Sequence, residues 1–218
     1  PYLTPGITAS WADAAGIHGI SHAAFPGAGG ADSQQALTVV AVGALGTAIL
    51  LPSLGRAREL ANRSADAASA RGLAQSCIVY AAEHDDKFPD SLAPLLTEGM
   101  VIPHQLVSKR SGTPPLPLAQ FTADQNNPAQ LEKDLAGHCD FVYLGKGLTS
   151  DTNAEIALIY QNPGPRIQDG INIAFEDGHT EFVKYSGLRD AFKATNAYRK
   201  AHGMSVVDVD ALLKAAPK

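Results

Sequence analysis

An apolar run, Leu37 to Leu51, is followed directly by Pro52 and then by a basic stretch of helix-forming residues. The chain has no charged side chain from residue 33 to residue 55, and Arg56 is its first cation. A helix rises about 1.5 Å per residue and bilayer hydrocarbon is about 30 Å thick, so about 20 residues span it. With its uncharged flanks the run just reaches that length. The pattern predicts one long helix whose first half needs lipid or protein around it and whose second half needs water. The alternative is a helix buried in a globular core.

The long helix is expected to run from Ser33 to His84, with Ser33 as its N-cap. Pro52 lies inside it and removes one backbone hydrogen bond, which favours a local kink. In the later part, Leu73, Cys77 and Tyr80 recur at spacings of four and three residues. Such a stripe is typical of a helix face that covers a sheet.

Short strands and helices are predicted after the long helix. Strands are expected at 141–144, 156–160 and 171–175, and the last forms a hairpin with 180–185 across the Asp177-Gly178 turn. A short helix follows Ser91 and stops at Gly99, and 130–135 adds a helical turn. Between them, 108–128 reads as a loop rich in proline and polar residues, and the tail from 187 onward as one or two amphipathic helices.

Several of these segments resemble the type IV pilin and type II secretion pseudopilin superfamily. Most specific are ILLPSLGRARE, Ile49 to Glu59, and the hairpin sequence within Ile171 to Val183. The segments Cys77 to Val101 and Phe141 to Leu148 are also similar to their counterparts in that superfamily. The resemblance implies an α+β fold, in which a long N-terminal hydrophobic α-helix packs on a small antiparallel β-sheet head. It divides the chain into an arm (1–32), the helix (33–84, apolar in 33–55), the head (85–187) and a helical tail (188–218).

The N-terminal region departs from the family pattern. Aligning Pro52 with the family proline places the processing junction at Gly30–Ala31, yet residues 1–30 contain no Lys or Arg. Gln35 stands where the family has a glutamate that neutralises a neighbouring free amine. A chain that is not cut at Gly30 has no amine there, and a neutral Gln35 then leaves no unpaired buried charge. The missing basic leader and the neutral Gln35 are consistent with each other. Together they indicate a pilin-like subunit that escapes standard processing or is processed elsewhere.

The resemblance implies a structural subunit of an extracellular helical filament, with hydrophobic helices in the filament core and heads outside. The partner is then the chain itself, with the inner membrane holding the subunit before assembly. The alternative is a membrane-anchored, pseudopilin-like protein that never polymerises and acts in secretion or surface display. The expected assembly core consists of Gln35, Leu37, Val39, Val40, Val42, Gly43, Leu45, Gly46, Ile49, Leu50, Leu51 and Pro52.

The first 30 residues are rich in Ala, Gly, Ser and Pro and have no sustained hydrophobic period. They are expected to form an extended arm or a partly ordered surface segment. Four large apolar residues in this arm are the expected anchors on a neighbouring subunit or on the chain's own domain: Trp11, Ile17, Ile20 and Phe25.

Charge and motif content exclude other classes of function. The net charge is −5, and the arginines at 56–63 are too few for a nucleic-acid surface, so no nucleic-acid partner is expected. The chain contains no nucleophile elbow, zinc-protease, P-loop or dinucleotide-binding pattern. We therefore expect no enzyme and no cofactor.

Two groups of residues are candidates for a cation site. Pseudopilins of the secretion branch often hold calcium in a C-terminal loop, and Asp151, Asn153 and Glu155 have the alternation that calcium loops favour. Asp177 and His179 can converge if the turn between them permits it. The alternative for this second pair is a turn-stabilising aspartate and a structural histidine.

Cys77 and Cys139 are the only cysteines, an even number for a protein expected outside the cytoplasm. The resemblance places them on two elements that pack together in a pilin head. A disulfide between them and a pair of small buried thiols both remain open.

Overall fold

The computed structural model describes residues 7–13, 16–22, 33–150 and 153–217, with side chains at residue 18 and from residue 53 onward. The chain divides into two compact units, 1–56 and 57–218. The second unit is of the α+β class, with helices and one four-stranded antiparallel sheet. It combines the later half of the long helix with the segments predicted as head and tail.

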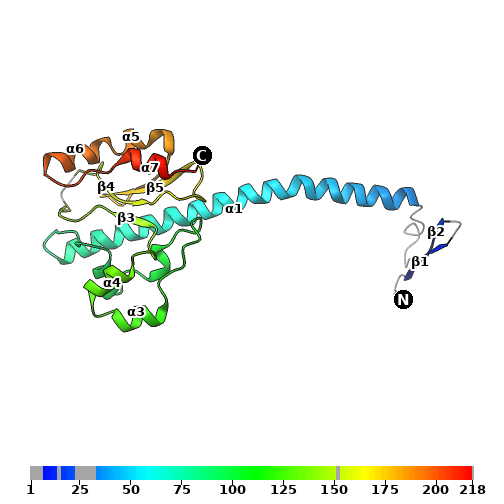
Figure 1. The fold of residues 1–218 in the computed structure, drawn as a ribbon, viewed down its shortest axis with the longest axis horizontal. Helices are drawn as coiled ribbons and strands as arrows, with labels where there is room; N and C mark the ends of the chain where they lie inside the picture. The colour runs from blue at the N-terminus through cyan, green and yellow to red at the C-terminus, as the bar shows by residue number, and fades with distance from the viewer. Residues whose placement is uncertain (1–6, 14–15, 23–32, 151–152, 218) are drawn as a thin grey trace, which may run out of the picture. The chain divides into compact units, whose positions relative to one another are not determined.

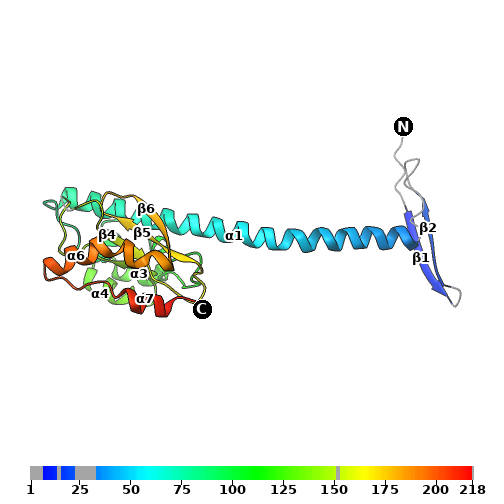
Figure 2. The same ribbon diagram turned by 90° about the horizontal axis from the view of Figure 1, so that it is seen from above.

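In the first unit, strands β1 (Ile7–Asp13) and β2 (Gly16–His22) lie side by side as an antiparallel hairpin (Figure 2). Trp11 pairs with His18, Ile20 with Ala9, and Ile17 with Ala12. These residues are therefore paired strands, a pairing that the expected extended arm or partly ordered segment did not specify. Gly and Ser interrupt any regular alternation of apolar residues in this segment. Strand pairing does not need that alternation, because backbone N–H and C=O groups form hydrogen bonds with one another across the two strands. Phe25 and the expected junction Gly30–Ala31 lie outside the described residues.

The long helix, α1, runs from Ser33 to Glu83, which confirms the predicted helix to within one residue. Its end is closed by hydrogen bonds from the backbone N–H groups of His84 and Asp86 to Ala81 O, at 3.0 and 2.9 Å. Asp85 and Asp86 have positive φ angles of 54° and 60°, which turn the chain away from the helix axis. Within the residues whose side chains are described, no helix is long and apolar enough to cross a membrane. The run 37–51 precedes those residues.

The sheet is a meander of four strands in sequence order: β3 (Phe141–Tyr143), β4 (Ala157–Gln161), β5 (Gly170–Phe175) and β6 (Thr180–Lys184). All four strands were predicted to within one residue, as was the β5–β6 hairpin. Gly178, in the turn between them, has a φ of 82°. This is the positive φ for which the turn was expected to need glycine. Every residue of β4 and β5 is buried, so helices cover both faces of the sheet.

One face of the sheet packs against α1 (Figure 1). Leu73, Ala74 and Cys77 of α1 are fully buried in a core that includes Leu158 and Ala174 of the strands. The predicted stripe is confirmed in part, because Tyr80 is only partly buried at the edge of this core. Short helices extend the same core: α2 (Ala93–Thr97), η1 (Pro103–Leu106), α3 (Leu118–Asp124) and α4 (Pro128–Asp134).

The C-terminal residues cover the opposite face of the sheet (Figure 1). After the turn η2 (Tyr185–Gly187), this region forms α5 (Leu188–Ala191), α6 (Lys193–Ala201) and α7 (Val209–Ala215). Leu188 and Phe192 are 0% exposed and belong to a second core with Ile171 and Ile173 of β5. The predicted tail is thus helical, and it is an integral layer of the second unit.

Candidate functional site

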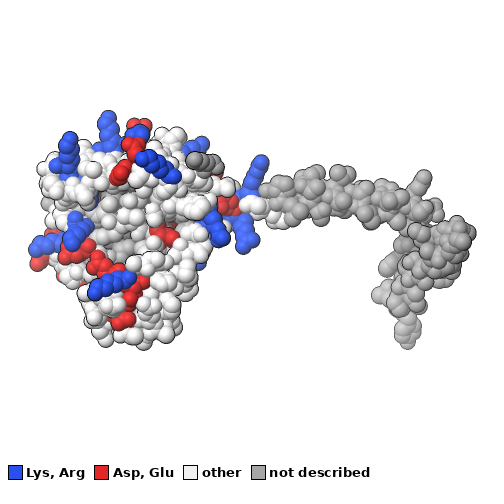
Figure 3. Space-filling view, viewed as in Figure 1, with Lys and Arg blue, Asp and Glu red and all other residues white. Residues whose placement is uncertain are grey.

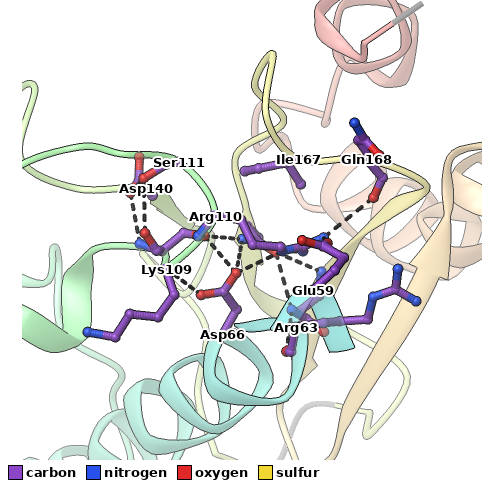
Figure 4. Close-up of polar contacts among 12 residues, drawn as sticks. Glu59, Arg63, Asp66, Lys109, Arg110, Ser111, Asp140, Ile167 and Gln168 are labelled. Carbon is purple, nitrogen blue, oxygen red and sulfur yellow. Dashed lines mark hydrogen bonds and ion pairs between the residues drawn. The ribbon is translucent and has the colours of Figure 1, made fainter. Parts of the chain in front are cut away.

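A carboxylate lies on the buried face of α1. Asp66 is 0% exposed, one turn before the apolar residues that contact the sheet. Its two oxygens accept four hydrogen bonds: from Ser108 Oγ (2.6 Å), Lys109 N (2.7 Å), Arg110 Nε (2.9 Å) and Gln161 Nε2 (2.8 Å) (Figure 4). An ionised carboxylate is expensive to bury unless it is paired and fully hydrogen-bonded. Asp66 meets both conditions.

Arg110 provides the opposite charge. Its side chain is 1% exposed, and Nε lies 2.9 Å from Asp66 Oδ2. The remaining guanidinium nitrogens donate to Gln161 Oε1 at 2.7 Å, to Glu59 Oε1 at 3.3 Å and to Gln168 O at 3.4 Å. Arginine suits this position because its planar group presents several donors in fixed directions, so one side chain reaches α1, β4 and the loop before β5 at once.

The sheet contributes two buried amides. Gln161 ends β4 and Asn172 lies in β5, and both are 0% exposed. Asn172 Nδ2 donates to Gln161 Oε1 at 3.2 Å, while Gln161 Nε2 also donates to Ser108 Oγ at 2.7 Å. These bonds connect neighbouring strands to the loop that carries Ser108 and Arg110. The guanidinium of Arg63, one turn before Asp66, lies 4.0 Å from the ring centre of Phe182 on β6.

A second carboxylate shapes the loop that carries Arg110. Asp140, just before β3, accepts hydrogen bonds from Ser108 N (2.8 Å), Ser111 Oγ (2.5 Å) and Thr113 Oγ1 (2.7 Å). The predicted loop 108–128 is confirmed for 108–117, whose first residues two carboxylates hold, and is wrong for 118–124, which form α3. Asp140 and Asp66 together fix the loop between α1 and the sheet.

We call Asp66, Ser108, Arg110, Gln161 and Asn172 the polar joint. Its charged groups are directed at one another and Asp66 uses both oxygens internally, whereas Asn172 Oδ1 is buried without a hydrogen-bond partner among the described residues. Both carboxylate oxygens of Asp66 are thus engaged by groups of the chain itself. The polar joint connects α1, the loop that carries Ser108 and Arg110, and strands β4 and β5. These contacts position α1 against the sheet.

The sequence analysis missed the polar joint, although one signal was available. Asp66 precedes Ala70, Leu73 and Cys77 at helical spacing, so a charged residue continues the apolar stripe. A charge in such a stripe indicates a buried partner. The identity of that partner depends on the loop, which no local pattern specifies.

The candidate cation residues are occupied in other ways. Asp177 accepts a hydrogen bond from His179 N at 2.9 Å and contacts the His179 ring, which stacks on Phe175 with ring centres 4.3 Å apart. Burial raises the pKa of the Asp177 carboxyl, but hydrogen bonds from His179 outweigh it and leave the pKa below its usual value. The pair therefore converges as a turn-stabilising contact.

The other candidate group, Asp151, Asn153 and Glu155, is described only in part. Asn153 Oδ1 accepts from Glu155 N at 3.0 Å, and Asp151 lies outside the described residues. Among the residues that are described, no group of three or more His, Cys, Asp or Glu side chains is placed to hold a metal ion.

Of the two alternatives for the cysteines, the structure has the pair of thiols: Cys77 and Cys139 are both free and form no disulfide. Cys77 is fully buried, whereas Cys139 is half-buried and its Sγ–H donates to Phe141 O at 3.1 Å. This hydrogen bond directs the Cys139 thiol to the backbone of β3. Burial raises the pKa of both thiols, that of Cys139 to about 11.

Comparison with protein-family models, curated proteins and solved structures gives no match to this chain.

Replacing Asp66 by alanine should strongly destabilise the second unit. The change removes four hydrogen bonds and leaves Arg110 buried without its nearest carboxylate, so unfolding should need about 3–5 kcal/mol less. Glu59→Ala is the matched control, because Glu59 is partly exposed and makes one longer ion pair with the same arginine. Its cost should be about 1 kcal/mol or less. Urea unfolding followed by circular dichroism measures both, and equal costs would contradict the proposed role of Asp66.

The two thiols should be poorly reactive in the folded protein. The thiolate is the nucleophile, and a raised pKa leaves little of it at pH 8. Alkylation should therefore be slow at pH 8, faster as the pH approaches 11 at Cys139, and rapid at both sites in urea. Mass spectrometry of peptides digested without reductant provides the check. Recovery of a peptide linked through Cys77 and Cys139 would restore the disulfide hypothesis.

Proposed function

We propose that this chain is the structural subunit of a pilin-like extracellular filament, in which apolar helices form the core and the second unit forms the outer head. The observation that carries the proposal is the division of α1 between the two compact units. The helix has 51 residues, and its later part is built into the compact unit that begins at residue 57. The uncharged residues 33–55 precede that unit. At about 1.5 Å per residue, α1 is roughly 75 Å long.

The later part of α1 obtains its apolar cover within the chain, since Ala70, Leu73, Ala74, Cys77 and Ala81 are all 0% exposed. The earlier apolar residues need a different cover, which lipid supplies to a single subunit and neighbouring helices supply in an assembly. Small residues at 43, 44, 46 and 48 permit close approach of helices, which favours assembly. We propose that the subunit is held in the inner membrane first and joins a homopolymer later.

The polar joint suits such a subunit. In a filament, tension passes from the helical core to the heads through α1, so the attachment of α1 to the sheet must resist sliding along the helix axis. An ion pair with directional hydrogen bonds opposes a shift of even one residue, whereas a face of alanines alone has little to oppose it.

Enlarging the helix surface at residue 46 should abolish filaments. Gly46→Leu prevents close helix approach and Val42→Asp places a charge in an apolar assembly, while neither change touches residues 57–218. Gly46→Ala is the matched control and should retain filaments because the residue stays small. Negative-stain microscopy of material sheared from cells, together with thermal unfolding of the second unit, measures assembly and folding separately. Normal filaments from both disruptive variants would refute the proposal. Wild-type subunits that remain in the membrane fraction without filaments would favour the membrane-anchored alternative.

Deletion of residues 1–28 should shorten or weaken the filaments. An isolated two-stranded hairpin is marginally stable in water, and ordering its backbone costs about 1–2 kcal/mol per residue. The β1–β2 hairpin therefore needs a surface to cover it, and we propose that adjacent subunits supply that surface through Trp11, Ile17, Ile20 and Phe25. The deleted chain should keep the thermal unfolding of the second unit. Filaments of normal length that resist heat and detergent as the full chain does would exclude this role.

A further inference from the structure

A cavity of about 620 Å³ lies at the carboxyl end of α1. Its walls come from the last turn of the helix, the following turn at 85–90, and the loop around Gly147. Phe88 N donates to Leu148 O at 3.2 Å, and Lys87 pairs with Thr149 as an isolated β-bridge. The backbone thus holds the two loops together, so the cavity is preformed.

The cavity is negatively charged. Glu83, Asp85 and Asp90 line it, against one cation, Lys87. These three carboxylates have no hydrogen-bond or ion-pair partner within the described parts of the chain. The pKa of Tyr80, on the wall, is raised by burial and then by the nearby carboxylates Glu98 and Asp90. That direction is the one that a negative local potential produces.

One wall of the cavity is aromatic. The rings of Tyr80 and His84 stack with centres 3.8 Å apart and planes 2° from parallel, and Phe88 lies in the same lining. A flat aromatic surface beside carboxylates is suited to a guanidinium group, which stacks on rings and donates to carboxylates in its own plane. The chemistry of the cavity therefore selects arginine over a compact, strongly hydrated ammonium.

The same chain carries exposed arginines without partners. Arg56 and Arg58 are exposed, and no hydrogen bond or ion pair joins them to another described residue. Figure 3 shows Lys and Arg side chains gathered where α1 enters the second unit. Arg58 and Glu83 are about 40 Å apart along α1, so the arginines of one chain do not reach the cavity of the same chain.

We propose that the cavity at the carboxyl end of α1 binds Arg56 and Arg58 of a second copy of this chain, so that heads join end to end. The inference rests on the proposed function for its biological setting, because a contact between two different patches repeats from subunit to subunit and builds an open polymer when the rotation between subunits does not close a ring. The charges steer and orient the two copies, and the apolar helices contribute the remaining affinity.

Paired charge reversals test the contact in the full chain, purified in mild detergent and followed by sedimentation velocity. One variant carries Arg56→Glu and Arg58→Glu, and the other carries Glu83→Lys and Asp90→Lys. Asp85 is left unchanged because its positive φ disfavours lysine. The control carries Glu132→Lys and Glu155→Lys, which change the net charge by the same amount as the cavity variant, at exposed positions outside the cavity.

Each cavity or arginine variant alone should associate at least about tenfold more weakly than the wild-type chain, and added salt should weaken wild-type association. An equimolar mixture of the two variants should regain wild-type association, because every contact in an alternating assembly again joins opposite charges. A variant that is merely misfolded is not rescued in this way. The control should associate like the wild type.

Three results would overturn the inference: unchanged association of both variants, a folded mixture that stays weak, or a control that weakens equally. Wild-type chains that do not associate would overturn it as well, since the occupant would not be a second copy. Normal filaments from each variant alone would refute this contact but would leave the proposed filament function in place. Rescue by mixing, without wild-type filaments on cells, would support the contact and count against the filament.

Discussion

The ion pair between Asp66 and Arg110 constrains most of the second unit. Removing two charges from water costs several kcal/mol for each charge. Their mutual attraction inside the protein offsets this cost only when the geometry is good and the remaining donors and acceptors are hydrogen-bonded. Asp66 therefore requires Ser108 and Gln161 close to it, and Arg110 requires Gln161 in turn. These demands fix the loop before β3, the end of β4 and one face of α1 relative to one another. Asp140 holds the same loop from its other side.

The apolar contacts around this pair are less selective. The face of α1 against the sheet is largely alanine, with Ala70, Ala74 and Ala81 fully buried. These small side chains bring the helix close to the strands, and beside Leu73 and Cys77 they offer few large side chains that oppose a shift along the helix axis. Apolar burial thus supplies the driving force for packing, and the polar joint selects one register. The C-terminal helices seal the other face through Leu188 and Phe192.

Local patterns in the sequence were sufficient for most of the secondary structure of the second unit, although not for η1 and α3. Helix α1, the four strands and the Gly178 turn were predicted because hydrophobic period and turn residues act over a few residues. The joint was missed because Asp66 and Arg110 are 44 positions apart and meet only in the folded chain. The β1–β2 hairpin was missed because backbone pairing does not require apolar alternation. The cavity, too, depends on a loop near Gly147 that is distant in sequence from α1.

The distribution of charge along α1 connects these features. Arg56 and Arg58 mark the point at which the uncharged part of the helix gives way to the part that the second unit buries, and Glu83 marks its end. Because Asp66 and Arg110 compensate each other inside, the exposed charges at the two ends are free to act between chains. In the proposed assembly, long-range attraction between the unlike ends orients subunits before apolar surfaces touch. The polar joint sets where Arg58 and Glu83 lie relative to the sheet, because both belong to the part of α1 that it holds against the strands.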